Sequence, residues 1–261
     1  MTLIFIKDAY GKDLNNVDDM DQHIELSSYY RENPSIFIGR IQAAIEELKL
    51  GLGGSIMVET DKIALIGYCF GGTGALMYAL SGEDDALGVV SVHGGLMPFE
   101  INSDPVDSPR VLVLSGGDDD TYTDVSVLED TFNNANNTWE ITRYSHAEHG
   151  FTDFYSDAYN YWADMRSWES TKTWLHELFG FSEYVKDEPE SFNVIPVDYD
   201  DLDGDEIIQL RGYLSLPEGS FYDAHTQSRP LVVIIHDGDG VNDYEKKRAT
   251  MLADLGYIPD I

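Results

Sequence analysis

The sequence predicts an α/β fold with a mostly parallel, doubly wound sheet, and two observations lead to it. Short apolar runs alternate with segments of helical spacing along the first 180 residues. The apolar runs are continuous rather than alternating with polar residues, which is typical of parallel strands buried on both faces. With 261 residues, 43% of them hydrophobic, the chain is long enough to bury such a sheet.

The first portion, 1–180, supplies most of the expected elements. Each helix is recognised by apolar residues that return every three or four positions, as Ile38, Ile41, Ile45 and Leu48 do before Gly51. Strands are expected at 2–6, 63–67, 87–92, 111–114 and 139–144, and helices at 35–50, 71–80, 124–132 and 165–178.

The pattern changes after a polar segment, 181–193, which we interpret as a linker. Two strands, 194–200 and 207–216, flank Asp203-Gly204-Asp205, a plausible hairpin turn. A strand at 231–235 and a helix at 242–255 follow, and 257–261 has the pattern of a further strand beginning.

The composition is strongly acidic, with 48 Asp and Glu against 16 Lys and Arg and a formal net charge of −32. Such a surface repels nucleic acids and anionic membranes, so neither is an expected partner. Adaptation to high salt and simple high solubility both remain open as explanations of the charge.

Targeting and metal signals are missing from the sequence. The amino terminus has neither the basic start nor the apolar length of a signal peptide, and no run approaches the roughly 20 apolar residues of a membrane helix. We therefore expect a cytoplasmic protein. The acidic run 199–204 does not have the spacing of a calcium-binding loop, and no helix carries a pair of histidines four residues apart, so we predict no metal and no cofactor.

The segment Gly67-Tyr68-Cys69-Phe70-Gly71 fits the nucleophile-elbow pattern, with cysteine as the nucleophile. It lies between a predicted strand and a predicted helix, as that motif requires in an α/β-hydrolase fold. The following helix directs its amino terminus at the sulfur, which favours the thiolate. Cys69 is the only cysteine, so no intramolecular disulfide can form.

Two later segments supply the partners that a nucleophilic cysteine needs. In this fold an acidic residue and then a histidine follow the nucleophile, each just after a later strand. Asp118, Asp119 and Asp120 follow the strand at 111–114, and His149 follows the strand at 139–144. The bland interpretation is a solvated acidic loop and a surface histidine.

These segments together resemble the dienelactone hydrolase family. The resemblance is carried by 67–72, by Gly116-Gly117-Asp118-Asp119 and by His149-Gly150-Phe151, with further similarity at 8–12 and 166–168. It implies Cys69 as nucleophile, His149 as general base and acid, and Asp119 as the carboxylate that orients His149. Asp118 or Asp120 would replace Asp119 if the register were shifted by one residue.

The order of segments differs from that of the family, in which the equivalents of 211–214 and 231–257 come first. We therefore expect a circularly permuted α/β-hydrolase fold, one domain in which 194–261 is the family's amino-terminal portion and 1–180 its carboxyl-terminal portion. Two truncated half-domains are the alternative. The resemblance further implies that Asp237, where the family has glutamate, interacts with the resting thiol, and that the N–H groups of Phe70 and Gly238 form the oxyanion hole.

One departure bears on the substrate. The family carries an arginine four residues after the catalytic histidine, and here that position is Asp153. A carboxylate there would repel an anionic substrate, although Arg31 or Arg40 could supply a cation from another direction. We expect hydrolysis of small neutral esters or lactones through an acyl-thioester, by a monomer or homodimer. A true dienelactone hydrolase and a catalytically silent binding module are the alternatives.

Overall fold

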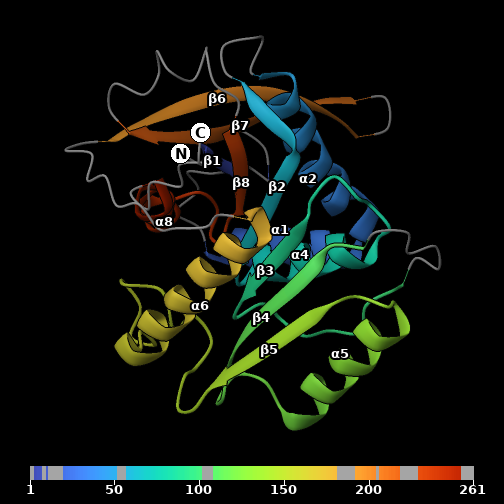
Figure 1. The fold of residues 1–261 in the computed structure, drawn as a ribbon, viewed down its shortest axis with the longest axis vertical. Helices are drawn as coiled ribbons and strands as arrows, with labels where there is room; N and C mark the ends of the chain where they lie inside the picture. Colours follow the sequence, from blue (N-terminus) through green and yellow to red (C-terminus); the bar gives the residue numbers. More distant parts are fainter. Residues whose placement is uncertain are drawn as a thin grey trace.

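Within the described residues of the computed structural model, eight strands form one sheet in the order β5-β4-β3-β2-β8-β1-β7-β6 (Figure 1). The structure describes residues 3–7, 10, 20–51, 57–101, 108–180, 192–203, 206–217 and 229–253. The six strands from β5 to β1 are parallel, and β7 and β6 continue the sheet as an antiparallel hairpin.

The strands are β1 (Leu3–Lys7), β2 (Val58–Tyr68), β3 (Gly88–Val92), β4 (Arg110–Gly116), β5 (Trp139–Tyr144), β6 (Phe192–Asp203), β7 (Glu206–Pro217) and β8 (Arg229–Ile235). The helices are α1 (Met20–Glu32), α2 (Pro34–Lys49), α4 (Phe70–Leu80), α5 (Tyr122–Asn134), α6 (Tyr161–Phe179) and α8 (Asp243–Ala253).

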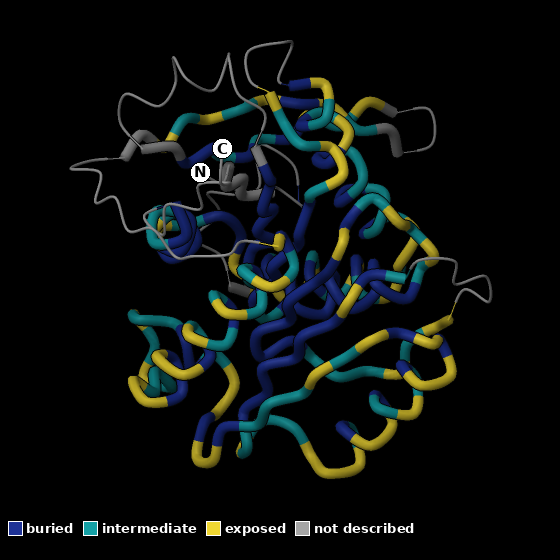
Figure 2. Tube along the Cα trace, in the orientation of Figure 1, coloured by how far each residue is buried: buried dark blue, intermediate teal, exposed yellow. Residues whose placement is uncertain are grey.

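Helices cover both faces of the parallel strands. Successive side chains of a strand point to opposite faces, so Ile63 and Leu65 of β2 pack in the core under α2 and α4. Their neighbours Ala64 and Ile66 pack in a second core under α6 and α8. Residues 63–68 of β2, 88–92 of β3 and 230–235 of β8 are buried (Figure 2), which confirms the predicted doubly wound α/β architecture.

Strand β8 lies between β2 and β1, although it is far from both in sequence. Its residues pair in parallel with both neighbours, with Val233 opposite Leu65 of β2 and Phe5 of β1. The prediction that 231–235 lies in the sheet that carries Cys69 is therefore confirmed. The predicted proximity of Met1 and Ile261 falls outside the described residues.

Helix α1 was not expected from the sequence, because its buried face is polar. His23, Ser27 and Tyr30 are spaced at helical intervals and are at most 7% exposed, whereas Ile24 is 56% exposed. Apolar periodicity is the main sequence signal for a helix, and a stripe of His, Ser and Tyr does not produce it.

Some predicted boundaries were wrong. Strand β6 begins at Phe192, so the linker assigned to 181–193 is shorter than predicted, and residues 181–191 are outside the described part of the chain. Strand β2 begins at Val58 rather than at Ile63, because five mostly polar residues extend it alongside β8. The predicted strand at 257–261 also falls outside the described residues. None of the described helices is long and apolar enough to span a membrane.

A buried ion pair attaches α8 to the rest of the fold. Arg248 is 1% exposed and binds both the Asp164 carboxylate of α6 and the carbonyl of Thr152, the latter at 2.8 Å. Its guanidinium also faces the ring of Phe154, 4.4 Å from the ring centre. Removing one partner of such a pair leaves an uncompensated charge in a dry environment.

We therefore expect Arg248→Leu to lower the free energy of unfolding by about 3–5 kcal/mol in urea denaturation. The double variant Arg248→Leu/Asp164→Leu should be more stable than Arg248→Leu, because no charge is left unpaired. The control is Lys246→Leu on the same helix, whose pair with Asp243 is solvent-exposed, with an expected loss below about 1 kcal/mol. Equal losses for Arg248→Leu and Lys246→Leu would contradict this role of the ion pair.

Candidate active site

The residues that the sequence singled out follow the carboxyl ends of parallel strands. Cys69 comes after β2, Asp119 after β4, His149 after β5 and Asp237 after β8. The carboxyl ends of parallel strands meet at one edge of the sheet, where ligand sites of open α/β sheets are found. The topology thus gathers these side chains from both portions of the chain.

The backbone at Cys69 is strained, as the elbow pattern requires. Cys69 has φ 47° and ψ −111°, a conformation that side chains rarely adopt, and it is the residue before α4. A Cβ on Gly67 would lie 1.9 Å from the carbonyl oxygen of Gly71, and a Cβ on Gly71 would lie 2.2 Å from that of Ile235. Glycine is needed at both positions because the backbones leave no room for a side chain.

His149 connects Cys69 to Asp119 through its two ring nitrogens. The Nε2 atom is 2.9 Å from the Cys69 sulfur, and Nδ1 is 3.0 Å and 3.2 Å from the two carboxylate oxygens of Asp119. The three side chains therefore form a continuous hydrogen-bonded series.

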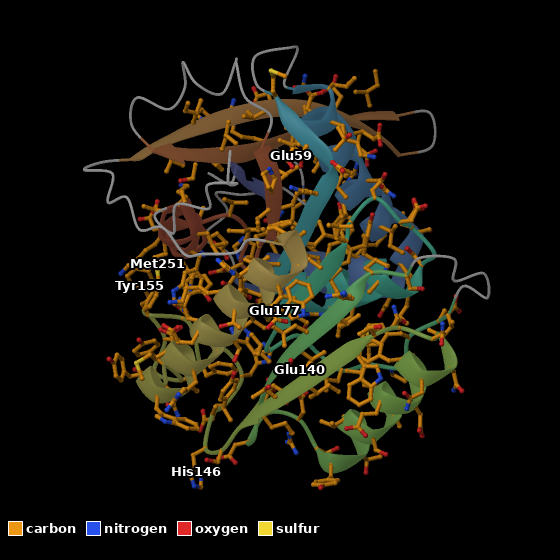
Figure 3. The ribbon with its side chains drawn as sticks, in the orientation of Figure 1. Glu59, Glu140, His146, Tyr155, Glu177 and Met251 are labelled. Carbon is orange, nitrogen blue, oxygen red and sulfur yellow. The ribbon has the colours of Figure 1, made fainter. Side chains whose placement is uncertain are left out.

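The neighbouring carboxylates are used differently. Asp120 accepts a hydrogen bond of 2.6 Å from the Ser115 hydroxyl, and Asp118 lies 3.7 Å from Nδ1 of His146. His146 itself is 90% exposed and extends away from the fold (Figure 3). Of the three candidate aspartates, Asp119 is the one in contact with His149.

Opposing charges act on the Cys69 thiol. Burial and the nearby Asp237 carboxylate raise the pKa of Cys69, while contact with His149 lowers it, and the net effect is a raised pKa. Hydrogen bonds with Asp119 and with Cys69 raise the pKa of His149. Contact between the two side chains therefore lowers the pKa of Cys69 and raises that of His149, so the thiol and the imidazole are electrostatically coupled.

Asp237 lies beside this pair and is half-buried. Burial raises the pKa of Asp237, and its hydrogen bond with Cys69 lowers it in part. Asp237 also accepts a hydrogen bond from the N–H of Gly238, one of the two donors predicted for the oxyanion hole. The other, Phe70, occupies the first position of α4, where helix geometry leaves the N–H without an intrahelical partner.

Similarity to known proteins agrees with this arrangement. The model of the dienelactone hydrolase family matches residues 3–179. The chain belongs to this family. A solved structure named m3DLH superposes with a TM-score of 0.55 at 25% identity, covering 67% of this chain and 85% of that one. A dienelactone hydrolase-like promiscuous phosphotriesterase from metagenomic libraries gives 0.52 at 24% identity, covering 68% and 85%. The α/β-hydrolase fold is thereby confirmed.

Two relatives are similar in sequence. An uncharacterized protein of Caenorhabditis elegans is 30% identical over 151 residues, which are 54% of this chain and 92% of that protein. A probable 2-oxo-3-(5-oxofuran-2-ylidene)propanoate lactonase of Bradyrhizobium sp is 27% identical over 130 residues, or 45% of this chain and 51% of the lactonase.

In this member of the family, further carboxyl groups lie near Asp237. Burial followed by the charge of Asp237 raises the pKa of Asp239 to about 7 and that of Glu245 to about 8. Asp153, at the position where the resemblance led us to expect arginine, raises the pKa of both Asp237 and Asp239 through its charge. Each of these carboxyl groups therefore makes ionisation of its neighbours less favourable.

The two arginines that could offset these charges lie in different surroundings. Arg40 is 2% exposed and forms an ion pair with Asp201 of β6, so the prediction that it might face a substrate was wrong. Arg31 donates to Ser27 at 3.2 Å and lies 5.4 Å from the ring centre of Phe70. Arg31 is thus the cation that remains beside the site.

Three residues near the site were missed by the sequence analysis as functional candidates. Tyr10 donates a hydrogen bond of 2.8 Å to the carbonyl of Gly238. Glu245 accepts from the N–H groups of Asp237 and Asn242, at 3.1 Å and 3.0 Å, and so spans the turn that contains Gly238. His93 accepts a hydrogen bond from the N–H of Cys69. It follows β3, so its position at the carboxyl end of a predicted strand was a usable signal.

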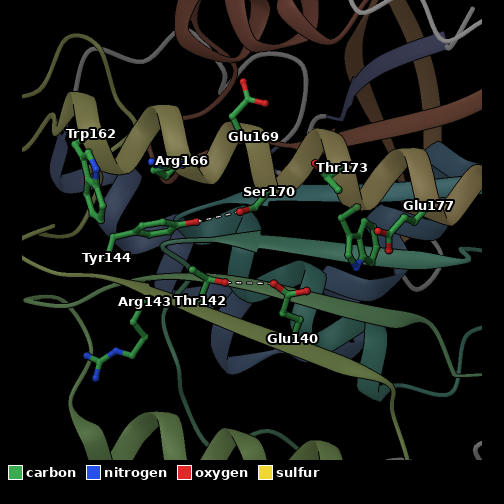
Figure 4. Close-up of a pocket in the computed structure, with 11 residues that line it drawn as sticks. Glu140, Thr142, Arg143, Tyr144, Trp162, Arg166, Glu169, Ser170, Thr173 and Glu177 are labelled. Carbon is green, nitrogen blue, oxygen red and sulfur yellow. Dashed lines mark hydrogen bonds between the residues drawn. The ribbon is translucent and has the colours of Figure 1, made fainter. Parts of the chain in front are cut away.

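The described residues also form two surface pockets. One, of about 440 Å³, lies between β5 and α6, is lined by residues such as Tyr144, Trp162 and Trp174 (Figure 4), and contains none of Cys69, Asp119, His149 and Asp237. The other, of about 460 Å³, is lined by residues that include Arg31. Within the described part of the chain, no group of three or more His, Cys, Asp or Glu side chains could hold a metal ion.

The contacts of the thiol make a prediction about its acidity. Asp237→Asn removes a negative charge that raises the pKa of Cys69, so that pKa should fall. Because Cys69 is the only cysteine, the rate of alkylation by iodoacetamide as a function of pH reports this thiol alone. Asp243→Asn, at an exposed carboxylate of α8, is the control and should leave the profile unchanged. A profile that moves to higher pH in Asp237→Asn would overturn the assignment.

Proposed function

We propose that this chain is a carboxylic ester hydrolase in which Cys69 is the nucleophile, His149 the general base and acid, and Asp119 the orienting carboxylate. The observation that carries the proposal is the contact series from Asp119 through His149 to a strained Cys69, with 2.9 Å between Nε2 and the sulfur. A nucleophile, a base and a group that orients the base, each within hydrogen-bonding reach, are what covalent catalysis requires.

The reaction begins when the Cys69 proton moves to Nε2 of His149 and the thiolate attacks the ester carbonyl. A carbon–sulfur bond forms, and the tetrahedral intermediate collapses by expelling the alcohol oxygen, which takes the proton from His149. Water then attacks the acyl-thioester while His149 accepts its proton. The acid leaves, and the proton returns to the sulfur. No cofactor enters these steps.

The oxyanion of the intermediate would bind the N–H groups of Phe70 and Gly238. A Cβ built on Gly238 would lie 3.8 Å from Cβ of Phe70, so the two residues are neighbours. The Gly238 N–H donates to Asp237 at rest. The oxyanion must therefore replace the Asp237 carboxylate as the acceptor of this N–H. Binding of the substrate would in this way move the negative charge of Asp237 away from the Cys69 thiol.

Small neutral esters or lactones are the proposed substrates. Support comes from Asp153 and Asp237, whose negative charges would repel a carboxylate near the scissile bond. A dienelactone is the second candidate. It is favoured by the similarity to the probable lactonase of Bradyrhizobium sp and by Arg31, which could pair with a carboxylate from the α1 side.

We further propose that the chain is one domain whose two portions stand in permuted order relative to the family. The family match ends at residue 179, yet β8 lies between β2 and β1, and Asp237 and Gly238 follow just after it. The proposed oxyanion hole therefore draws on both portions.

The direct test of the function is hydrolysis of p-nitrophenyl butyrate by the wild type and by Cys69→Ala. We expect kcat to fall by about a thousandfold or more, because no nucleophile remains. Circular dichroism should show that the fold survives. Cys69→Ser is the matched variant and should keep measurable activity, since base and oxyanion donors remain. A Cys69→Ala variant with a substantial share of wild-type activity would exclude this mechanism.

The proposed substrate class is tested with two p-nitrophenyl esters, the neutral butyrate and the monoester of glutarate, which carries a free carboxylate. The neutral ester should have the higher kcat/KM, and Asp153→Asn should narrow the difference at low ionic strength. Asp157→Asn, at an exposed carboxylate of the same loop, is the control. A glutarate monoester hydrolysed as efficiently as the butyrate by the wild type would contradict the proposal.

A further inference from the structure

His93 is a buried histidine that makes direct contact with the nucleophile turn. It is 1% exposed and follows β3 with φ 39°, a conformation unfavourable for a side chain with a Cβ. Its Nδ1 accepts a hydrogen bond of 3.2 Å from the N–H of Cys69, and its Nε2 lies 2.8 Å from the hydroxyl of Thr152. Thr152 belongs to the loop that carries His149.

These contacts determine the tautomer of His93. Since Nδ1 accepts from a backbone N–H, the ring proton must be on Nε2, which therefore donates to Thr152. The Thr152 hydroxyl is then free to donate to the Tyr244 hydroxyl of α8, with which it is in contact. Burial lowers the pKa of His93 far below its usual value, so the ring stays neutral and keeps its accepting nitrogen.

The backbone around His93 has little freedom to move. A Cβ on Gly94 would lie 2.4 Å from the Ser91 hydroxyl and 2.6 Å from the carbonyl carbon of Gly72, so the chain after β3 crosses the start of α4 at backbone distance. The Cys69 N–H is shared with the carbonyl of Val92, 3.0 Å away. His93 is thus fixed relative to the nucleophile turn.

The loop that carries His149 needs such a support. Residues 145–160 connect β5 to α6 without a helix or strand, and His149 is 47% exposed in its side chain. The ring of His93 meets that of His149 edge-on, with 5.5 Å between ring centres. The position of the His149 Nε2 atom therefore depends on hydrogen bonds between this loop and the neighbouring strands and helices.

We propose that His93 is a positioning residue that holds the Cys69 turn and the His149 loop at the separation required for proton transfer. It acts through two hydrogen bonds, from the Cys69 N–H to Nδ1 and from Nε2 to Thr152. The inference rests on the proposed function of Cys69 and His149. The hydrogen bonds of His93 connect the end of β3 to the nucleophile turn and to the loop after β5. Through Thr152 and Tyr244 they also reach helix α8.

The test substitutes Thr152, which touches neither reacting side chain. Thr152→Val removes the acceptor, so kcat for p-nitrophenyl butyrate should fall by about tenfold or more with KM nearly unchanged. Thr152→Ser keeps the hydroxyl and should restore kcat. The iodoacetamide profile of Cys69 should move to higher pH in Thr152→Val alone, because His149 no longer stabilises the thiolate as well.

Thr171 provides the matched control. It is 2% exposed, and its hydroxyl donates to Ser167 within α6, away from the site. Thr171→Val therefore tests the loss of a buried threonine hydroxyl as such, and its kcat and alkylation profile should equal those of the wild type.

A double-mutant cycle separates positioning from general damage. Asn tolerates the backbone conformation of His93 and can accept from Cys69, but it cannot reach Thr152, so His93→Asn should resemble Thr152→Val. The double variant should lose no more activity than either single one. Additive losses, or a failure of Thr152→Ser to restore kcat, would overturn the proposal. If the wild type hydrolyses no ester, the proposed function fails, and the alkylation profiles still decide the role of His93.

Discussion

The crowded backbone at the nucleophile turn is the constraint on which the rest of the structure depends. Three chain segments meet there at distances that exclude side chains. Gly67 faces Gly71, and Gly71 faces the carbonyl of Ile235. A Cβ built on Gly72 would lie only 2.8 Å from the Cα of Gly94. The start of α4 can only sit between β8 and the end of β3 because these positions are glycines. Late residues therefore belong to the same site as Cys69.

Two opposing electrostatic effects act on the pKa of the Cys69 thiol at this turn. The carboxylate of Asp237 and burial oppose the thiolate, whereas His149, supported by Asp119, favours it. The net effect of these opposing contacts is a raised pKa of the thiol. A thiol with a raised pKa resists oxidation and alkylation better than a thiolate does.

Positive charges are rare in this chain, and several of the described ones are used inside the structure. Arg248 and Arg40 are both at most 2% exposed and pair with Asp164 and Asp201. Each joins segments far apart in sequence, α8 to α6 and α2 to β6. Because the chain has 48 acidic and only 16 basic residues, these internal ion pairs leave even fewer basic side chains to offset the acidic ones elsewhere.

The sequence alone determined what depends on neighbouring residues in the chain. The elbow glycines, the order of nucleophile, acid and histidine, and the continuous apolar strands are local signals, and each predicts an element or a side chain without knowledge of its partners. Tertiary structure decided what depends on distant neighbours: Asp119 rather than Asp118 or Asp120, the burial of Arg40, helix α1 with its polar inner face, and the contact of His93 with Cys69 and Thr152. Hydrogen bonds between segments leave no periodic trace in sequence, so only the folded chain reveals them.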